Sequence, residues 1–392
     1  MTSDGLKIVS VRTLRATRLH GRDEQWITDR YRSIKADLAV VVIETDGGVT
    51  GIGEACAYGN PVQIADWVQW FAPTLIGREL DDFSVVPQPN GSALNHATRT
   101  AHDFAVAGID CALWDARAKL AGLPVSVLLN PLADQTVQVY ASGGVRYDWH
   151  GRPEQLIDDV VSYVAQGYRT VKFRLGTSWV WDAVSPERFL ALFDQVRREV
   201  GDTVHLAVDA NSRLTRDEAR ALAFGLQDRG AAWLEEPLAK DDLEGYAALN
   251  AQLELLISGG ESFTSTEQFR PWLEAGAFDI VQPDAGVCGI SEVMRIGALA
   301  QRHGAQLIPH SWHNGLMLMA NAHAVAALSN APMVEECMVQ GPLRWGSVVG
   351  GTRVHDGMVE LASTPGLGVE IIDELEDQYP YVEGHYSVEL RR

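Results

Sequence analysis

Three acidic residues recur at a constant interval along the chain. Asp209, Glu235 and Glu261 lie 26 residues apart (209 to 235 to 261), each at the end of a short apolar run. One strand–helix unit of a parallel α/β fold has about this length, so the acids occupy equivalent places in successive units. Crowded carboxylates repel one another unless a cation binds among them, and an all-oxygen ligand set favours Mg²⁺. One such acid could merely cap a helix, but three at one interval favour a magnesium site.

The same interval joins an acid to a histidine further along the chain. Asp284, in Gln-Pro-Asp, and His310, in Ile-Pro-His, are again 26 residues apart (284 to 310) and follow two further apolar runs. A carboxylate beside an imidazole orients the ring and raises its basicity. A single histidine among eleven is usually structural. The matching position of the acid nevertheless predicts a His310/Asp284 pair that removes a proton.

Two basic residues end an earlier apolar run. Lys172 and Arg174 alternate with Val171, Phe173 and Leu175. Successive side chains of a strand point to opposite faces, so both cations face one way and the apolar residues face the other. Two cations opposite a metal ion suit the binding of an anionic substrate.

These residues need a framework that brings them together. Eight apolar runs follow residue 136, and amphipathic stretches such as 186–200 and 216–229 separate them. The runs are Val137–Ala141, Thr170–Phe173, Val204–Val208, Ala232–Leu234, Leu255–Ser258, Asp279–Val281, Gln306–Ile308 and Met333–Val334. This alternation predicts an α/β fold, a TIM-like (β/α) barrel of seven or eight units with its active site at the carboxyl ends of the strands. A doubly wound open sheet is the alternative, but no glycine-rich dinucleotide-binding motif follows the first strand.

The region before the barrel has another pattern. Strand-like stretches come first and helical ones follow, which is typical of an α+β domain. The stretches are Leu6–Thr17, Asp37–Glu44 and Val49–Glu54, then Pro61–Phe71 and Thr98–Ala121. We therefore predict a capping domain over residues 1–130 and a catalytic barrel over residues 131–359. Residues 360–392 are expected to pack back on the capping domain.

The composition limits the partners. A formal net charge of −20 disfavours nucleic acid and anionic membranes. The apolar runs fall short of the ~18 residues that a membrane span needs, and the first residues lack the pattern of a secretory signal. The four cysteines form no CxxC pair, which favours reduced thiols. We expect a cytoplasmic protein with a small anionic substrate and with no nucleic-acid or membrane partner.

Taken in order, these motifs resemble the enolase superfamily and, within it, the mandelate racemase subgroup. The set is Lys-x-Arg at 172–174, Asp-x-Asn at 209–211, Glu-Glu-Pro at 235–237, Gly-Gly-Glu at 259–261, Gln-Pro-Asp at 282–284 and Pro-His at 309–310. The helix-like segment 108–115 with Lys119 and the tail Pro365–Gly368 also match. Each motif is short, but the ordered set is specific and covers nearly the whole chain.

The resemblance implies a shared first step, in which Mg²⁺ binds the substrate carboxylate, a base removes the α-proton and an enediolate is stabilised. It implies Asp209, Glu235 and Glu261 as metal ligands and the His310/Asp284 pair as a base. Glu335 matches an eighth-strand acid that hydrogen-bonds the substrate, with Glu336 as the neighbouring alternative. Four substrate-binding residues are also expected. Asn211 belongs to the Asp-x-Asn motif, and Trp312 lies in the loop after His310. His20 and Tyr58 lie in the capping loops at 20–32 and 56–61. A homo-oligomer that orders the capping loops is also expected.

Arg174 departs from the subgroup pattern. Members that racemise commonly have Lys-x-Lys here, with the second lysine as the opposing base. A guanidinium, with a pKa of about 12.5–13.8, is almost never deprotonated. Dehydration needs only one face of the substrate, because His310 can take the α-proton and then protonate the departing β-hydroxyl. We therefore predict a dehydratase that converts an aldonate or aldarate to a 2-keto-3-deoxy acid.

Three alternatives remain open. An epimerase, racemase or lactone cycloisomerase would use the same enolate, with Lys172 as a possible second acid/base. A non-catalytic barrel that binds a sugar acid is disfavoured by the complete set of candidate ligands. A muconate-cycloisomerase or dipeptide-epimerase type would have a lysine after the sixth strand, where this chain has Asp284.

Overall fold

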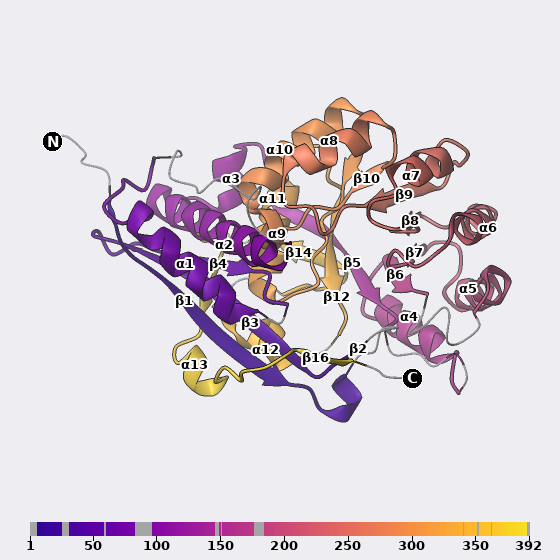
Figure 1. The fold of residues 1–392 in the computed structure, drawn as a ribbon, viewed down its shortest axis with the longest axis horizontal. Helices are drawn as coiled ribbons and strands as arrows, with labels where there is room; N and C mark the ends of the chain where they lie inside the picture. The colour runs from indigo at the N-terminus through magenta and orange to yellow at the C-terminus, as the bar shows by residue number, and fades with distance from the viewer. Residues whose placement is uncertain are drawn as a thin grey trace.

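The computed structural model of the protein describes most of the chain. The described residues are 6–25, 31–58, 60–82, 96–145, 149, 151–175, 184–339, 341–350, 353–361 and 363–389. Figure 1 shows a barrel with an N-terminal layer of strands and helices packed against it.

Eight parallel strands form the barrel. In chain order they are β5 (Thr136–Gly143), β6 (Thr170–Arg174), β7 (His205–Asp209), β8 (Trp233–Glu235), β9 (Leu256–Gly259), β10 (Ile280–Val281), β11 (Gln306–Leu307) and β12 (Met333–Cys337). The hydrogen-bonded order is β11-β10-β9-β8-β7-β6-β5-β12, which places the first strand beside the last. Leu307 of β11 donates its N–H to the carbonyl of Asn330, just before β12, at 3.0 Å. The eight predicted strands are confirmed, and this ring excludes the open-sheet alternative.

Helices connect the strands on the outside of the barrel (Figure 1). They are α4 (Gln155–Ala165), α5 (Pro186–Val200), α6 (Arg216–Gln227), α7 (Leu243–Asn250), α8 (Thr266–Glu274), α9 (Ala285–Cys288), α10 (Ile290–Arg302) and α11 (Gly315–Ala327). Local signals fix several ends. The Ser185 side chain accepts a hydrogen bond from the Arg188 N–H before α5, and Thr215 and Glu218 form a capping box before α6.

The N-terminal layer is an antiparallel sheet covered by two helices. Strands β1 (Ile8–Leu19), β3 (Lys35–Thr45) and β4 (Thr50–Ala55) pair in the order β1-β3-β4, and α1 (Pro61–Leu75) and α2 (His96–Ala121) follow. Gly53 allows β4 to approach α2 closely, because a Cβ there would lie 2.3 Å from the carbonyl oxygen of Gly108. The predicted α+β character of this region is confirmed.

The C-terminal segment returns to the N-terminal layer. Its strand β16 (Ser387–Glu389) pairs with β2 (Tyr31–Ser33), and the Lys35 ammonium donates to the carbonyl of Val382 at 2.6 Å. The domain boundaries at residues 130 and 359 stay a prediction. The remaining elements are η1 (Arg22–Glu24), α3 (Val125–Leu129), α12 (Pro342–Gly346), β13 (Val348–Gly350), β14 (Met358–Glu360), β15 (Val369–Ile371) and α13 (Leu375–Gln378).

The hydrophobic core fills the space between the barrel strands and their helices. Phe173 of β6 points outward and packs against Phe189 and Phe193 of α5, with ring centres 6.2 and 6.0 Å apart. Its neighbours Lys172 and Arg174 therefore point the other way, as the alternation predicts. No helix within the described ranges is both long enough and apolar enough to cross a membrane.

Candidate active site

Lys172 lies inside the barrel between two carboxylates. Its ammonium is 2.9 Å from Glu335 Oε1 and also contacts Glu235 Oε1, and all three side chains are buried. Burial favours the neutral amine, but Glu235 and Glu335 hold the pKa of Lys172 well above its usual value. The same ammonium lowers the pKa of Glu335 to about 2 although burial opposes this. Lys172 is therefore a fixed positive charge.

The three predicted metal ligands lie on adjoining strand ends. Asp209 and Glu235 are register partners on β7 and β8, and Glu261 follows β9. Burial and the neighbouring Asp209 raise the pKa of Glu235 to about 7, although Lys172 lowers it. Such crowding of carboxylates is the environment that a divalent cation relieves.

Each of these carboxylates has partners of its own in the structure. Asp209 accepts hydrogen bonds from the N–H and the amide of Asn211, both at 2.7 Å, where Asn211 has a left-handed φ of 47°. Glu235 accepts from the Gln282 amide at 2.5 Å, and Glu261 contacts the Lys240 ammonium at 3.2 Å. Within the described residues, no three His, Cys, Asp or Glu side chains are arranged to hold a metal ion. The residue types of Asp209, Glu235 and Glu261, and their positions on neighbouring strands, nevertheless fit a cation that prefers oxygen ligands.

His310 and Asp284 form the predicted pair. The distance from Nδ1 of the imidazole to Oδ2 of Asp284 is 2.8 Å, and Nε2 lies 3.8 Å from Glu261 Oε2. A carboxylate at Nδ1 fixes the ring hydrogen on that nitrogen. Nε2, which faces Glu261, is then the nitrogen that can accept a proton. Burial disfavours the imidazolium, but the bond to Asp284 and the charges of Glu335 and Glu261 raise the pKa of His310 to about 9.

Asn321 holds this pair in place and was not found from the sequence. Its amide donates to Asp284 Oδ1 at 3.1 Å and to the His310 carbonyl at 3.2 Å, and its oxygen accepts from the Ala285 N–H at 2.9 Å. It lies in the middle of α11, whose residues are all buried. An asparagine within such an apolar helix is a signal that a buried polar network is present.

Arg174 is the last residue of β6 and lies on the same face of the strand as Lys172. Its Nε lies 3.6 Å from Asp209 Oδ2, and its guanidinium stacks over the Trp312 ring at 4.5 Å. Burial lowers the pKa of Arg174, but Asp209 and Glu261 outweigh this and raise it. The group remains charged.

The two neighbouring acids of β12 point to opposite sides. Glu335 faces the interior and accepts from the Ser311 N–H at 2.7 Å. Glu336 faces outward, where it contacts the Tyr168 hydroxyl and lies 3.1 Å from the Arg344 guanidinium. Only Glu335 therefore shares the interior with Lys172.

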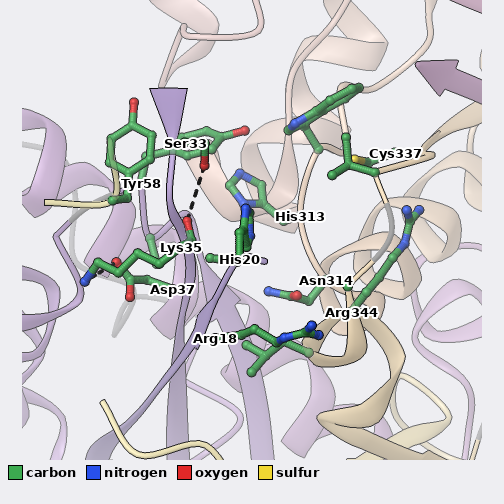
Figure 2. Close-up of a pocket in the computed structure, with 17 residues that line it drawn as sticks. Arg18, His20, Ser33, Lys35, Asp37, Tyr58, His313, Asn314, Cys337 and Arg344 are labelled. Carbon is green, nitrogen blue, oxygen red and sulfur yellow. Dashed lines mark hydrogen bonds and ion pairs between the residues drawn. The ribbon is translucent and has the colours of Figure 1, made fainter. Parts of the chain in front are cut away.

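A cavity of about 100 Å³ lies between the barrel and the N-terminal layer (Figure 2). It brings together three of the four predicted substrate-binding residues, His20, Tyr58 and Trp312. The fourth, Asn211, is bonded to Asp209 instead. Residues 26–30 and 59 of the two predicted capping loops lie outside the described residues.

Glu54 of β4 connects the N-terminal layer to α11. Its carboxylate accepts from the Asn314 amide at 2.8 Å and from the Met317 N–H at 3.0 Å, so it caps the helix from another part of the chain. Burial raises the pKa of Glu54 to about 7 against these hydrogen bonds. Sequence reasoning did not identify this residue, because the contact joins positions 260 residues apart.

The fold agrees with comparisons to known proteins. Residues 155–375 match the enolase C-terminal domain-like family, and residues 28–130 match the mandelate racemase / muconate lactonizing enzyme N-terminal domain. The chain belongs to the mandelate racemase / muconate lactonizing enzyme family of the enolase superfamily.

Individual proteins that are similar to this chain are named as dehydratases or as cycloisomerases. The chain is 30% identical to a D-galactarolactone cycloisomerase of Agrobacterium fabrum over 93% of this chain and 97% of that one. It is 31% identical to an arabinonate dehydratase of Saccharolobus solfataricus over 88% and 90% of the two chains. The crystal structure of the 3,6-anhydro-D-galactonate cycloisomerase of Zobellia galactanivorans superimposes with a TM-score of 0.82, at 28% identity, covering 96% of this chain and all of that one.

Proposed function

We propose that the protein is a Mg²⁺-dependent dehydratase of an acid sugar, which converts an aldonate or aldarate to its 2-keto-3-deoxy acid. The observation that carries the proposal is an asymmetry of the site. An imidazole oriented by a carboxylate at 2.8 Å lies after β11 on the Glu261 side of the predicted metal ligands, whereas the guanidinium of Arg174 lies at the end of β6 on the Asp209 side.

In this proposal Asp209, Glu235 and Glu261 hold the metal. A bound Mg²⁺ would neutralise the substrate carboxylate and so make the α-proton more acidic. Asn211, Gln282 and Lys240, which contact these carboxylates, orient them through hydrogen bonds and ion pairs.

His310 moves both protons. Its Nε2 takes the α-proton, with Asp284 at Nδ1 supporting the charge that develops on the ring. Removal of the α-proton needs the neutral imidazole. Glu261 is one of the groups that raise the pKa of His310. A cation held by Glu261 would offset that charge and so favour the neutral ring. The imidazolium then protonates the β-hydroxyl on the same face, and water leaves.

The fixed charges of the site bind the substrate. Lys172 and Arg174 stabilise the negative charge that grows on the carboxylate oxygens when the α-proton leaves. Glu335 lies in contact with Lys172, and in this proposal it accepts a hydrogen bond from a substrate hydroxyl. Because Arg174 does not give up a proton at neutral pH, it does not act as a base on the other face of the α-carbon.

A second candidate is a lactone cycloisomerase or an epimerase with the same first step. The relative named D-galactarolactone cycloisomerase, which matches over 93% of this chain, supports it. Incubation in D₂O separates the two. Dehydration gives a keto acid that has lost one water, whereas an epimerase gives deuterium at the α-carbon with every hydroxyl retained. A lactone cycloisomerase gives a product with the same elemental composition as its lactone.

The test is a screen of aldonates and aldarates with Mg²⁺, in which semicarbazide absorbance detects 2-keto acids. We expect a keto product from at least one sugar acid, and its loss in the His310→Asn variant. The matched control is His303→Asn, which changes a histidine at the end of α10 outside the site. Absence of a keto product across the whole set would contradict the proposed reaction.

A further inference from the structure

The third predicted metal ligand differs from the other two in how the chain holds it. Asp209 and Glu235 are the last residues of β7 and β8, so the hydrogen bonds of the barrel fix their backbone. Glu261 lies two residues beyond the end of β9. It belongs to a turn that the Phe263 N–H closes by donating to the Gly260 carbonyl at 3.0 Å. The direction of the Glu261 side chain therefore depends on what fixes this turn.

Both ends of the turn are anchored. At its start, Gly260 has a φ of 95° and packs on the Phe269 ring of α8, where a Cβ would lie 2.3 Å from the ring. At its end, the Thr264 N–H donates to the Gln268 side chain of α8 at 2.6 Å. The Thr264 hydroxyl lies 3.3 Å from the same Gln268 oxygen but donates at 2.9 Å to Oδ2 of Asp103. Thr264 and Asp103 are both buried.

Asp103 belongs to α2 of the N-terminal layer and not to the barrel. Its other carboxylate oxygen lies 2.9 Å from Nδ1 of His102. The His102 ring in turn packs against two aromatic rings of α1, Trp67 and Phe71, with ring centres 4.9 and 5.4 Å away. A buried carboxylate of the N-terminal layer, held in place by its own neighbours, thus contacts the turn that carries Glu261. No step of the proposed reaction uses this carboxylate.

A second carboxylate of α2 makes a similar contact with a different part of the barrel. Asp110, about two turns further along the helix, accepts from the Ser291 N–H at 2.8 Å and from the Ser291 hydroxyl at 2.5 Å. Ser291 lies at the start of α10, in a segment that carries none of the three predicted ligands. Both contacts dock α2 on the barrel, but of the two only the contact of Asp103 with Thr264 ends in a ligand-bearing turn.

We propose that Asp103 is a positioning residue for the metal site: through Thr264 it holds the turn that carries Glu261, so that the N-terminal layer sets the affinity of the barrel for its divalent cation. This inference rests on the proposed function, which assigns Glu261 as a ligand. A hydrogen bond to a carboxylate is strong and directional, and residues that orient a metal ligand contribute to metal affinity without touching the metal. Loss of the contact frees one side of the turn and leaves all three ligands present.

The test measures binding of Mn²⁺ alone to the full chain without substrate, from the electron paramagnetic resonance signal of the free ion. Thr264→Val keeps the shape of the side chain and removes the hydroxyl, and we expect its Kd for Mn²⁺ to rise about tenfold. Thr264→Ser keeps the hydroxyl and should bind as the wild type does. Asp103→Ala should also weaken binding, and the double variant Asp103→Ala/Thr264→Val should bind as weakly as Asp103→Ala, because both changes remove one contact.

The matched control is Asp110→Asn on the same helix, which replaces one acceptor of Ser291 by a donor. It should lower the Tm in EDTA and leave the Kd for Mn²⁺ unchanged. In turnover of a sugar acid, Thr264→Val should need more Mg²⁺ for half-maximal rate but reach the wild-type kcat when Mg²⁺ saturates. A general loss of structure would lower kcat at every Mg²⁺ concentration.

If Asp103→Ala does not fold, the comparison of Thr264→Val with Thr264→Ser decides, since both variants keep the carboxylate. A Kd of Thr264→Val equal to that of the wild type, or an equal rise in Asp110→Asn, would overturn the inference and leave the proposed function standing. Wild-type protein that binds no Mn²⁺ would instead overturn the assignment of Glu261 as a ligand, and the proposed metal-dependent function with it.

Discussion

The hydrogen-bonded carboxylate of Glu54 gives a stability prediction that depends on pH. Glu54 is buried and caps α11 through Asn314 and Met317. Burial raises its pKa from 4.5 to about 7, although these hydrogen bonds oppose the shift. The folded state therefore keeps the proton to a higher pH than the unfolded chain does. Stability is greatest below the unfolded pKa of 4.5 and falls as the pH rises towards 7.

The size of the effect follows from the shift. Two and a half pKa units correspond to about 3 kcal/mol in total, of which roughly 2.5 kcal/mol is lost between pH 5 and pH 8. Glu54→Gln has no ionisable group at this position, so residue 54 adds no pH dependence to the free energy of unfolding of the variant. Its amide nitrogen cannot accept the Met317 N–H, which costs about 1–3 kcal/mol. The variant should thus be less stable than the wild type at pH 5 and similar or more stable at pH 8.

Urea unfolding followed by tryptophan fluorescence measures this difference, with EDTA present so that metal binding adds no pH dependence. Glu44→Gln, at an exposed glutamate on the neighbouring strand β3, is the control and should show no such slope relative to the wild type. A difference between wild type and Glu54→Gln that stays constant from pH 5 to pH 8 would refute the raised pKa. A difference that grows with pH would mean that the N-terminus of α11 holds the carboxylate ionised.

Three further predictions concern the site. Removal of divalent ions with EDTA should abolish keto-acid formation, and Mg²⁺ should restore it; full activity in EDTA would contradict the assignment of Asp209, Glu235 and Glu261. Arg174→Lys should introduce a group that can exchange a proton, so the variant should wash deuterium from D₂O into the α-carbon while dehydration slows about tenfold or more; a variant without exchange would argue against placing this residue beside the α-carbon. Asn321→Ala should lower the free energy of unfolding by about 2–4 kcal/mol, because the Ala285 N–H loses its acceptor and Asp284 Oδ1 keeps the Gly286 N–H but loses the amide. It should also lower kcat more than it raises KM, and an unchanged kcat would show that Asn321 does not position the base.

Much of the fold could be predicted because its signals are local and repeated. The apolar runs, the 26-residue interval and the alternation around Lys172 each depend on neighbours in the sequence, and each also fits the barrel. The interval also predicted which polar residues would lie together. The distance between His310 and Asp284 follows from their equal positions on adjoining strands.

Other features of the site could not be predicted, because they depend on how the layers dock. Glu54 and Asn321 occupy stretches that show no motif, and their partners lie on other elements. The contacts of the predicted metal ligands could not be predicted either, because Asn211, Gln282 and Lys240 bind these carboxylates only in the folded structure. Periodicity places a residue on a face, but only the packed structure determines which neighbour it contacts.

The pairing of β16 with β2 has a consequence for how the enzyme is made. Tyr386, which lines the cavity, immediately precedes β16, and Lys35 donates to the carbonyl of Val382. During synthesis the N-terminal sheet leaves the ribosome first. The cavity beside this sheet is not complete until residues more than 340 positions later have been made. Contacts at such separation form late and slowly. Completion of this cavity is therefore one of the last events in the folding of this chain.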